Sequence, residues 1–149
     1  MKVRFTSENE IIELVRSFEE ATISRGAWGH AEHLTVALYY LMHHETEVAT
    51  GRMRDGIFNL LTKWFSVDLT KEMPYHETLT VFWMRTIAEF SSSSSNISLL
   101  EKANSLVEVF DKNYPLRFYS REVLFSEDAR KEFIEGDLPI TTSAFSASR

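Results

Sequence analysis

The sequence predicts an all-α fold: a single-domain helical bundle of four to five main helices plus short C-terminal helices. Apolar residues recur mainly at spacings of three and four, which is the period of an amphipathic helix. Only five Gly and three Pro interrupt the 149 residues, and no run alternates apolar and polar residues as a half-buried strand does. We expect one helical domain over residues 1–140. Residues 141–149 are small and polar, and we expect a frayed tail there.

The first helix is expected to begin after Ser7, because Ser7-x-x-Glu10 matches a capping box. It should end near Arg25-Gly26, where a glycine is typical of a helix C-terminus. One apolar stripe runs along it, formed by Ile11, Leu14, Val15, Phe18 and Ala21.

A third helix is expected over about residues 46–65, after a second that begins near His30. Gly51 and Gly56 weaken this expectation, since a glycine inside a helix costs about 1 kcal/mol relative to alanine. The residues expected to be buried along it are Val48, Met53, Ile57, Leu60, Leu61 and Trp64. Its basic residues are expected to form a solvated face, and they are Arg52, Arg54 and Lys63.

A fourth helix is expected over about residues 75–90, and it should stop at the serine run 91–95, which is typical of a solvated connector. Ser98 is expected to cap a fifth helix. Beyond that helix the chain should form shorter helical pieces, with Ser120 and Ser126 placed as N-caps.

Composition excludes several classes of function. A net charge of −6 provides no global positive field for a phosphate backbone, so we expect no nucleic-acid partner. The absence of cysteine removes disulfides, thiolate metal sites and cysteine nucleophiles together. No apolar run approaches the roughly 18 residues of a membrane span, and the N-terminus lacks a signal-peptide core. We therefore expect no membrane partner and a cytoplasmic location.

Three histidines form the candidate functional site. His30 and His33 lie three residues apart at the start of the second helix, and His76 lies at the start of the fourth. On helical wheels, His30 and His76 each fall on the apolar stripe of their helix, within about 80° and 60° of its members. His33 lies at the flank of its stripe. If the second and fourth helices run roughly parallel, the three imidazoles could meet at one end of the bundle.

Such a cluster would suit a divalent transition metal such as zinc. Burial and the positive end of a helix dipole both lower a histidine pKa, which keeps the imidazole neutral for coordination. Histidines at i and i+3 share a helix face and can bind one ion together. Three histidines, or histidines with Glu77, plus an open position are the usual layout of a catalytic zinc site. Glu77 is the candidate catalytic residue, and Tyr75 and Thr80 could orient the ligands.

Established catalytic motifs are absent. His76-Glu77 opens like H-E-x-x-H, but Thr80 stands where the second histidine ligand belongs, which excludes a zincin. The paired Glu-x-x-His motif of di-iron bundles is also missing. There is no nucleophile elbow, phosphate-binding glycine loop or dinucleotide fingerprint. Any chemistry must therefore use His, Glu, Tyr, Arg or a metal.

A structural interpretation of the same residues stays open. A histidine near a helix start is commonly a hydrogen-bonded core residue or a cap, and His43-His44 suit the polar end of a helix. The pairs Phe82-Trp83 and Trp64-Phe65 are more typical of a core than of a ligand site. The alternative to a small-molecule ligand site is then a non-enzymatic interaction module or homo-oligomer with structural histidines.

Four motifs stand out between Trp28 and Leu138. They are His-x-x-His-Leu at 30–34, Met53-Arg54-x-Gly56-Ile57, Tyr75-His76-Glu77-Thr78-x-Thr80-x-Phe82-Trp83, and Tyr119-Ser120-Arg121-x-x-Leu124-Phe125-Ser126-x-x-Ala129-Arg130. Together they resemble a family of small uncharacterised bacterial helical proteins with no assigned activity. The chain departs from that family at Ala27-Trp28-Gly29, where an apolar residue and a Ser or Thr cap are expected. It departs again at Met73-Pro74, where a glycine-containing loop is common. The resemblance implies the helical block structure and names no reaction.

Overall fold

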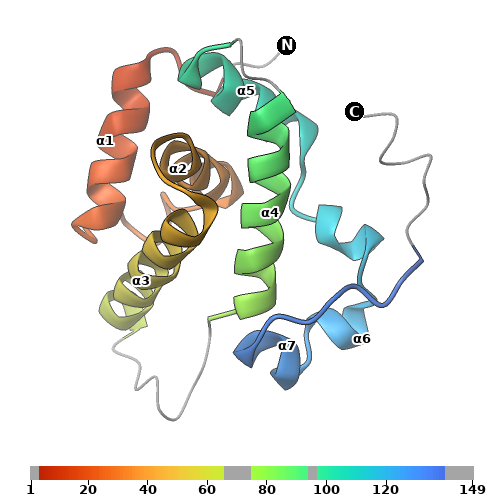
Figure 1. Ribbon diagram of the computed structural model, residues 1–149. Coiled ribbons are helices and arrows are strands. Elements are labelled where there is room, and N and C mark those ends of the chain that lie inside the picture. Colours follow the sequence, from red (N-terminus) through yellow and green to blue (C-terminus); the bar gives the residue numbers. More distant parts are fainter. Residues whose placement is uncertain (1–3, 66–74, 94–96, 140–149) are drawn as a thin grey trace.

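The regular elements of the computed structural model are all helices over the residues it describes, which are 4–65, 75–93 and 97–139 (Figure 1). The five main helices are α1 (Glu8–Glu19), α2 (His30–His43), α3 (Thr46–Phe65), α4 (Glu77–Ser93) and α5 (Leu99–Val109). They are followed by a short 3₁₀ helix, η1 (Tyr114–Arg117), and by α6 (Arg121–Leu124) and α7 (Glu127–Lys131). The predicted all-α bundle is confirmed. The predicted tail over 141–149 lies outside the described residues.

The central element is α2, which packs against α1, α3, α4 and α5. In Figure 1 it lies between α1 and α4 and is viewed nearly along its axis. All five residues over 34–38 are completely buried. The hydroxyl of Thr35 is satisfied locally, since it donates to the Ala31 carbonyl oxygen at 2.8 Å. A helix that is buried all round must be covered on every side, and this requirement arranges the other four helices around α2.

The predicted serine caps are confirmed. In each case the serine hydroxyl accepts the backbone N–H three residues further on, which satisfies one of the free donors at a helix start. The bonds measure 3.2–3.3 Å and involve Ser7, Ser98, Ser120 and Ser126. Each of these caps could be predicted because cap and partner lie within one turn of each other.

The end of α1 comes earlier than predicted, at Glu19 instead of near residues 25–26. Ala21 has a φ of 56°, in the left-handed region that ends a helix. The Thr22 N–H then bonds the Ser17 carbonyl oxygen at 2.9 Å, which closes the helix in a Schellman-type turn. The prediction was wrong because an alanine here takes a conformation usually left to glycine.

The predicted bounds of α3 are confirmed, and its two glycines have different surroundings. A Cβ atom on Gly56 would lie 2.2 Å from two ring carbons of Phe18, so α1 and α3 can approach only because this residue is glycine. A Cβ atom on Gly51 would meet nothing within 4 Å. The predicted buried stripe was wrong at Val48, which is 47% exposed, while the adjacent Ala49 is buried.

The end of α4 lies beyond the predicted stop at the serine run, because the helix continues to Ser93. The buried side chain of Lys102 in α5 contacts this end of α4, since its ammonium donates to the carbonyl oxygen and hydroxyl of Ser91 at 3.1 and 3.2 Å. Those bonds satisfy a buried charge that would otherwise be costly.

The C-terminal region packs onto α4, and α7 makes this contact. The Thr78 hydroxyl donates to the Glu132 carbonyl oxygen at 2.9 Å and accepts the Ile134 N–H at 3.1 Å. These two bonds attach the chain after α7 to the first turn of α4. Within the described ranges, no helix is both long and apolar enough to cross a membrane.

Candidate functional site

The three predicted histidines line one open pocket of about 400 Å³. His30 and His33 come from the first turn of α2, and His76 immediately precedes α4. The other lining residues are Trp28, Gly29, Ile57, Leu61, Tyr75, Leu79 and Thr80. Helix α2 is seen nearly end-on in Figure 1 whereas α4 runs along the page, so the two helices are not parallel. Residues at the starts of both nevertheless line the same pocket.

The start of α2 lacks a side-chain cap because its N-cap residue is Gly29. Glu32 compensates from the third helical position, since its Oε1 accepts the Gly29 N–H at 3.0 Å. Glu32 is buried and also forms an ion pair with Arg4. The N-terminal segment therefore helps to fix the helix start that carries His30 and His33.

His33 has ring nitrogens that form no hydrogen bond with any other described residue. Its imidazole meets the Trp28 ring edge-on, with centroids 6.0 Å apart. Burial lowers the pKa of His33 to about 4, and the nearby His30 contributes to the shift. The imidazole is therefore neutral at pH 7 and has an unshared electron pair.

His30 keeps one ring nitrogen available. Its Nε2 lies 2.9 Å from the carbonyl oxygen of Phe110, the residue that caps the end of α5. A carbonyl oxygen only accepts, so in the neutral imidazole Nε2 carries the proton and Nδ1 has the lone pair. No described residue forms a hydrogen bond with Nδ1. The ring also packs edge-on against Trp83, with centroids 5.2 Å apart.

His76 uses both ring nitrogens in the fold. Its Nδ1 accepts the Leu79 N–H at 3.2 Å, as an N-cap side chain does. Its Nε2 donates to the Leu124 carbonyl oxygen at 2.5 Å, which connects the start of α4 to the end of α6. Burial lowers the pKa of His76, assisted by the charge of Arg130 and opposed by the bond to Leu124. In this geometry His76 has no free donor for a metal.

Glu77, the predicted catalytic residue, does not line the pocket. Its carboxylate accepts two hydrogen bonds from Arg54, at 2.9 and 2.6 Å, and one from the Tyr75 hydroxyl at 2.7 Å. Burial alone would raise the pKa of Glu77, but the bonds from Arg54 and Tyr75 outweigh it and the pKa is lowered. The predicted solvated face was therefore wrong at Arg54.

No group of three or more His, Asp or Glu side chains in the described part of the chain is arranged to share one metal ion. The three histidines line one pocket but do not form such a group. Zinc binding by His30, His33 and His76 stays a prediction. His30 and His33 are the two members of this set with a nitrogen that no described residue occupies.

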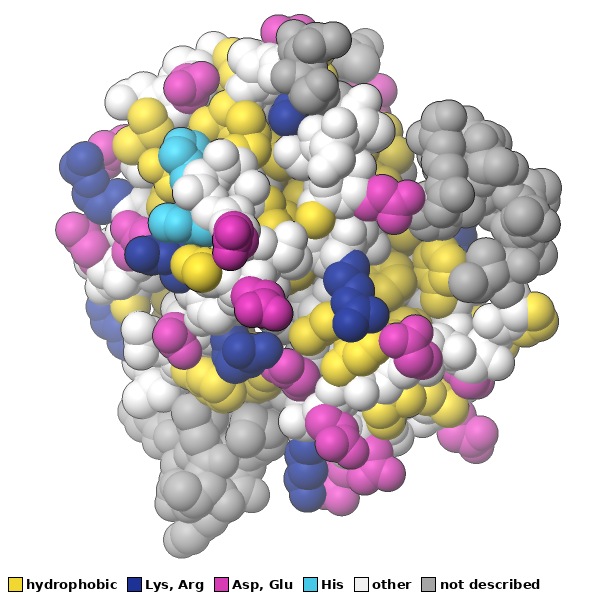
Figure 2. Space-filling model, viewed as in Figure 1, with side chains coloured by type: hydrophobic (Ala, Val, Ile, Leu, Met, Phe, Trp, Pro, Cys, Tyr) yellow, Lys and Arg dark blue, Asp and Glu magenta, His cyan; other side chains and the backbone are white. Residues whose placement is uncertain are grey.

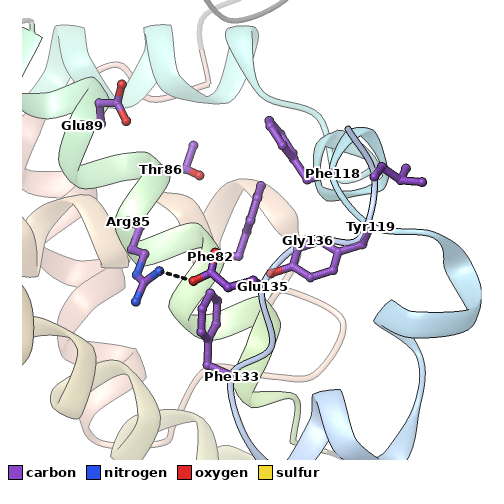
Figure 3. Close-up of a pocket in the computed structure, with 10 residues that line it drawn as sticks. Phe82, Arg85, Thr86, Glu89, Phe118, Tyr119, Phe133, Glu135 and Gly136 are labelled. Carbon is purple, nitrogen blue, oxygen red and sulfur yellow. Dashed lines mark hydrogen bonds and ion pairs between the residues drawn. The ribbon is translucent and has the colours of Figure 1, made fainter. Parts of the chain in front are cut away.

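A second pocket, of about 250 Å³, lies between α4 and the C-terminal region and was not predicted from the sequence (Figure 3). The two neighbouring aromatic residues Phe82 and Trp83 have different surroundings: Trp83 is buried in the core, and Phe82 lines this pocket. The concentration of Phe and Tyr over residues 114–133 was the available signal.

Comparison of the chain with protein-family models, with curated proteins and with solved structures gives no match.

Proposed function

We propose that the histidine pocket binds a small molecule together with a divalent transition metal such as zinc, with His30 and His33 as metal ligands. The pocket has the composition typical of a small-molecule site: apolar walls and a few convergent polar groups. The observation that carries the proposal is the state of His33. It is a neutral imidazole on a pocket wall, with neither nitrogen bonded to a described residue.

The pKa of His33 favours coordination over proton transfer. A general base works best when its pKa lies near the working pH, and a value of about 4 is too low at neutral pH. A metal ligand must instead be neutral, and this is the form that burial stabilises here. His30, one helical turn earlier, would add the second imidazole.

The surrounding residues would orient the site. The Arg54–Glu77 pair holds the hydroxyl of Tyr75, whose ring contributes to the pocket wall. The Thr80 hydroxyl donates to the His76 carbonyl oxygen at 3.1 Å and strengthens the first turn of α4. A bound metal would supply Lewis-acid polarisation of a coordinated carbonyl group or water. Glu77 then acts as a positioning residue and not as the base.

Titration of tag-free protein with zinc, monitored by isothermal calorimetry, tests the proposal. His33→Gln should weaken zinc binding at least about tenfold, because it removes a ligand. His43→Gln is the matched control, since His43 is exposed at the other end of the same helix. Absence of zinc binding, or an equal loss in both variants, would contradict the proposal.

His76→Asn distinguishes two ligand sets, because asparagine retains a good N-cap while it removes the imidazole. Unchanged zinc affinity would support a pair formed by His30 and His33. A loss as large as that of His33→Gln would support the full set of three, with His76 leaving its two hydrogen bonds when the metal binds.

A further inference from the structure

The second pocket lies between α4 and the extended chain after α7, and it shares no lining residue with the histidine pocket. Figure 3 shows Arg85, Thr86 and Glu89 of α4 on one side, Phe118 and Tyr119 on the other, and Phe133 below them. No histidine lines it. Its volume of about 250 Å³ is at the small end for ligand pockets, which limits the occupant to one or two rings.

The wall formed by residues 133–138 is firmly held. The Leu138 N–H bonds the Phe118 carbonyl oxygen at 3.0 Å, and the Tyr119 hydroxyl donates to the Ile134 carbonyl oxygen at 2.5 Å. Gly136 lies so close that a Cβ atom there would be 2.5 Å from the Phe118 carbonyl oxygen. The pocket is therefore formed before any ligand arrives, which reduces the entropy lost on binding.

The walls are aromatic. The Phe82 ring lies 5.5 Å from the Phe118 ring and 6.0 Å from the Tyr119 ring, centroid to centroid, with tilted or edge-on geometry. Such arrangements are the favoured ones for aromatic pairs. A planar aromatic ligand matches these walls.

The charges at the rim favour a cation. The Arg85 guanidinium lies 4.3 Å from the Phe133 ring centroid and 3.4 Å from Glu135, so one cation already occupies an aromatic face beside a carboxylate. The Glu135 side chain is 82% exposed and is only weakly engaged by this long ion pair. Glu89 adds a second carboxylate to the lining. Figure 2 shows hydrophobic side chains exposed between α4 and the C-terminal region, beside acidic and basic groups.

We propose that this pocket is a second ligand site, specific for a small aromatic amine. The ligand ring would pack against Phe82 and Phe118, and its ammonium group would bind the carboxylates of Glu135 and Glu89. An aromatic ring and a cation are the two groups that the walls and the rim attract. The site is independent of the histidine pocket and of any metal bound there.

Two probes with the same ring and opposite charge test this proposal: tryptamine and indole-3-propionate, each titrated into the full chain by isothermal calorimetry. We expect tryptamine to bind about two- to fivefold more tightly, since one exposed charge pair corresponds to a factor of up to about five. Glu135→Gln should weaken tryptamine binding about two- to fivefold and leave indole-3-propionate binding no weaker. Glu89→Gln should act in the same direction if the Glu135 variant is unstable.

Two further variants locate the binding site. Phe118→Ala should weaken tryptamine binding, because it removes a ring that packs on the ligand, whereas Phe125→Ala, which removes an exposed ring outside the pocket, should not. His33→Gln should also leave the tryptamine affinity unchanged, which separates this site from the proposed metal site. Equal affinity for the two probes, tighter binding of indole-3-propionate, absence of binding, or a loss in His33→Gln would each overturn the proposal.

Discussion

Arg54 in α3 and Glu77 at the start of α4 form a two-pronged ion pair, with Nε to Oε1 at 2.9 Å and a terminal nitrogen to Oε2 at 2.6 Å. The two side chains are 35% and 18% exposed, so solvent screens the pair only in part. The Tyr75 hydroxyl donates a third hydrogen bond to the carboxylate of Glu77. Because Tyr75 lines the histidine pocket, this pair connects the packing of α3 and α4 to the shape of the site.

Arg54→Gln should lower the free energy of unfolding by about 1–2 kcal/mol, because it removes two charge-assisted hydrogen bonds and leaves Glu77 without its cation. Arg52→Gln, on an exposed position of the same helix, should change it by less than about 0.5 kcal/mol. Urea denaturation of both variants provides the comparison. Similar losses at the two positions would show that the pair has no special role.

The parts of the fold that the sequence predicted depend on residues close to one another along the chain. Serine caps act within one turn, and an apolar period can be recognised within one helix. The Arg54–Glu77 pair joins residues 23 positions apart, and no local pattern distinguishes Arg54 from a solvated arginine. The close approach of Phe18 to Gly56 could not be predicted for the same reason, since it depends on how α1 packs against α3.

For the candidate site, too, the sequence predicted the features within each helix but not the contacts between distant segments. Helical wheels placed His30 and His76 on apolar faces, and both residues line the same pocket in the structure. The bond from His76 to the Leu124 carbonyl oxygen spans 48 positions and could not be inferred from either segment alone. The aromatic pocket is formed by segments that meet only in the folded chain, so the sequence indicated its rings without placing them together.

The two glycines of α3 should respond in opposite ways to alanine. Gly51→Ala should stabilise the protein by about 0.5–1 kcal/mol, since the position is open and alanine is the better helix former. Gly56→Ala should destabilise it by about 1–3 kcal/mol, because the new Cβ would displace the Phe18 ring in a fully packed contact. Thermal unfolding of the two variants measures both effects. Stabilisation by Gly56→Ala would contradict the close packing of α1 on α3.

The stability of the protein should fall between pH 7 and pH 5, and His33 should account for about 2 kcal/mol of that loss. In the unfolded chain a histidine has a pKa of about 6.5, whereas the folded protein lowers the pKa of His33 to about 4. Between these values the unfolded state binds the extra proton, so each unit of acidification costs the folded state about 1.4 kcal/mol. The loss begins near pH 6.5 and levels off below about pH 4.

His33→Gln isolates this contribution, because the comparison is made between two pH values within each protein. The difference in unfolding free energy between pH 7 and pH 5 should shrink by about 2 kcal/mol in the variant. It should persist in His43→Gln, which removes an exposed histidine from the same helix. His76, whose pKa is also lowered by burial, should maintain a smaller loss of the same sign in both variants. Glu77 and Asp137 do not interfere, since their lowered carboxyl pKa values confine their effect to more acidic solutions. An unchanged pH dependence in His33→Gln would show that its imidazole is not held in the neutral form, and the argument for metal coordination would then lose its main support.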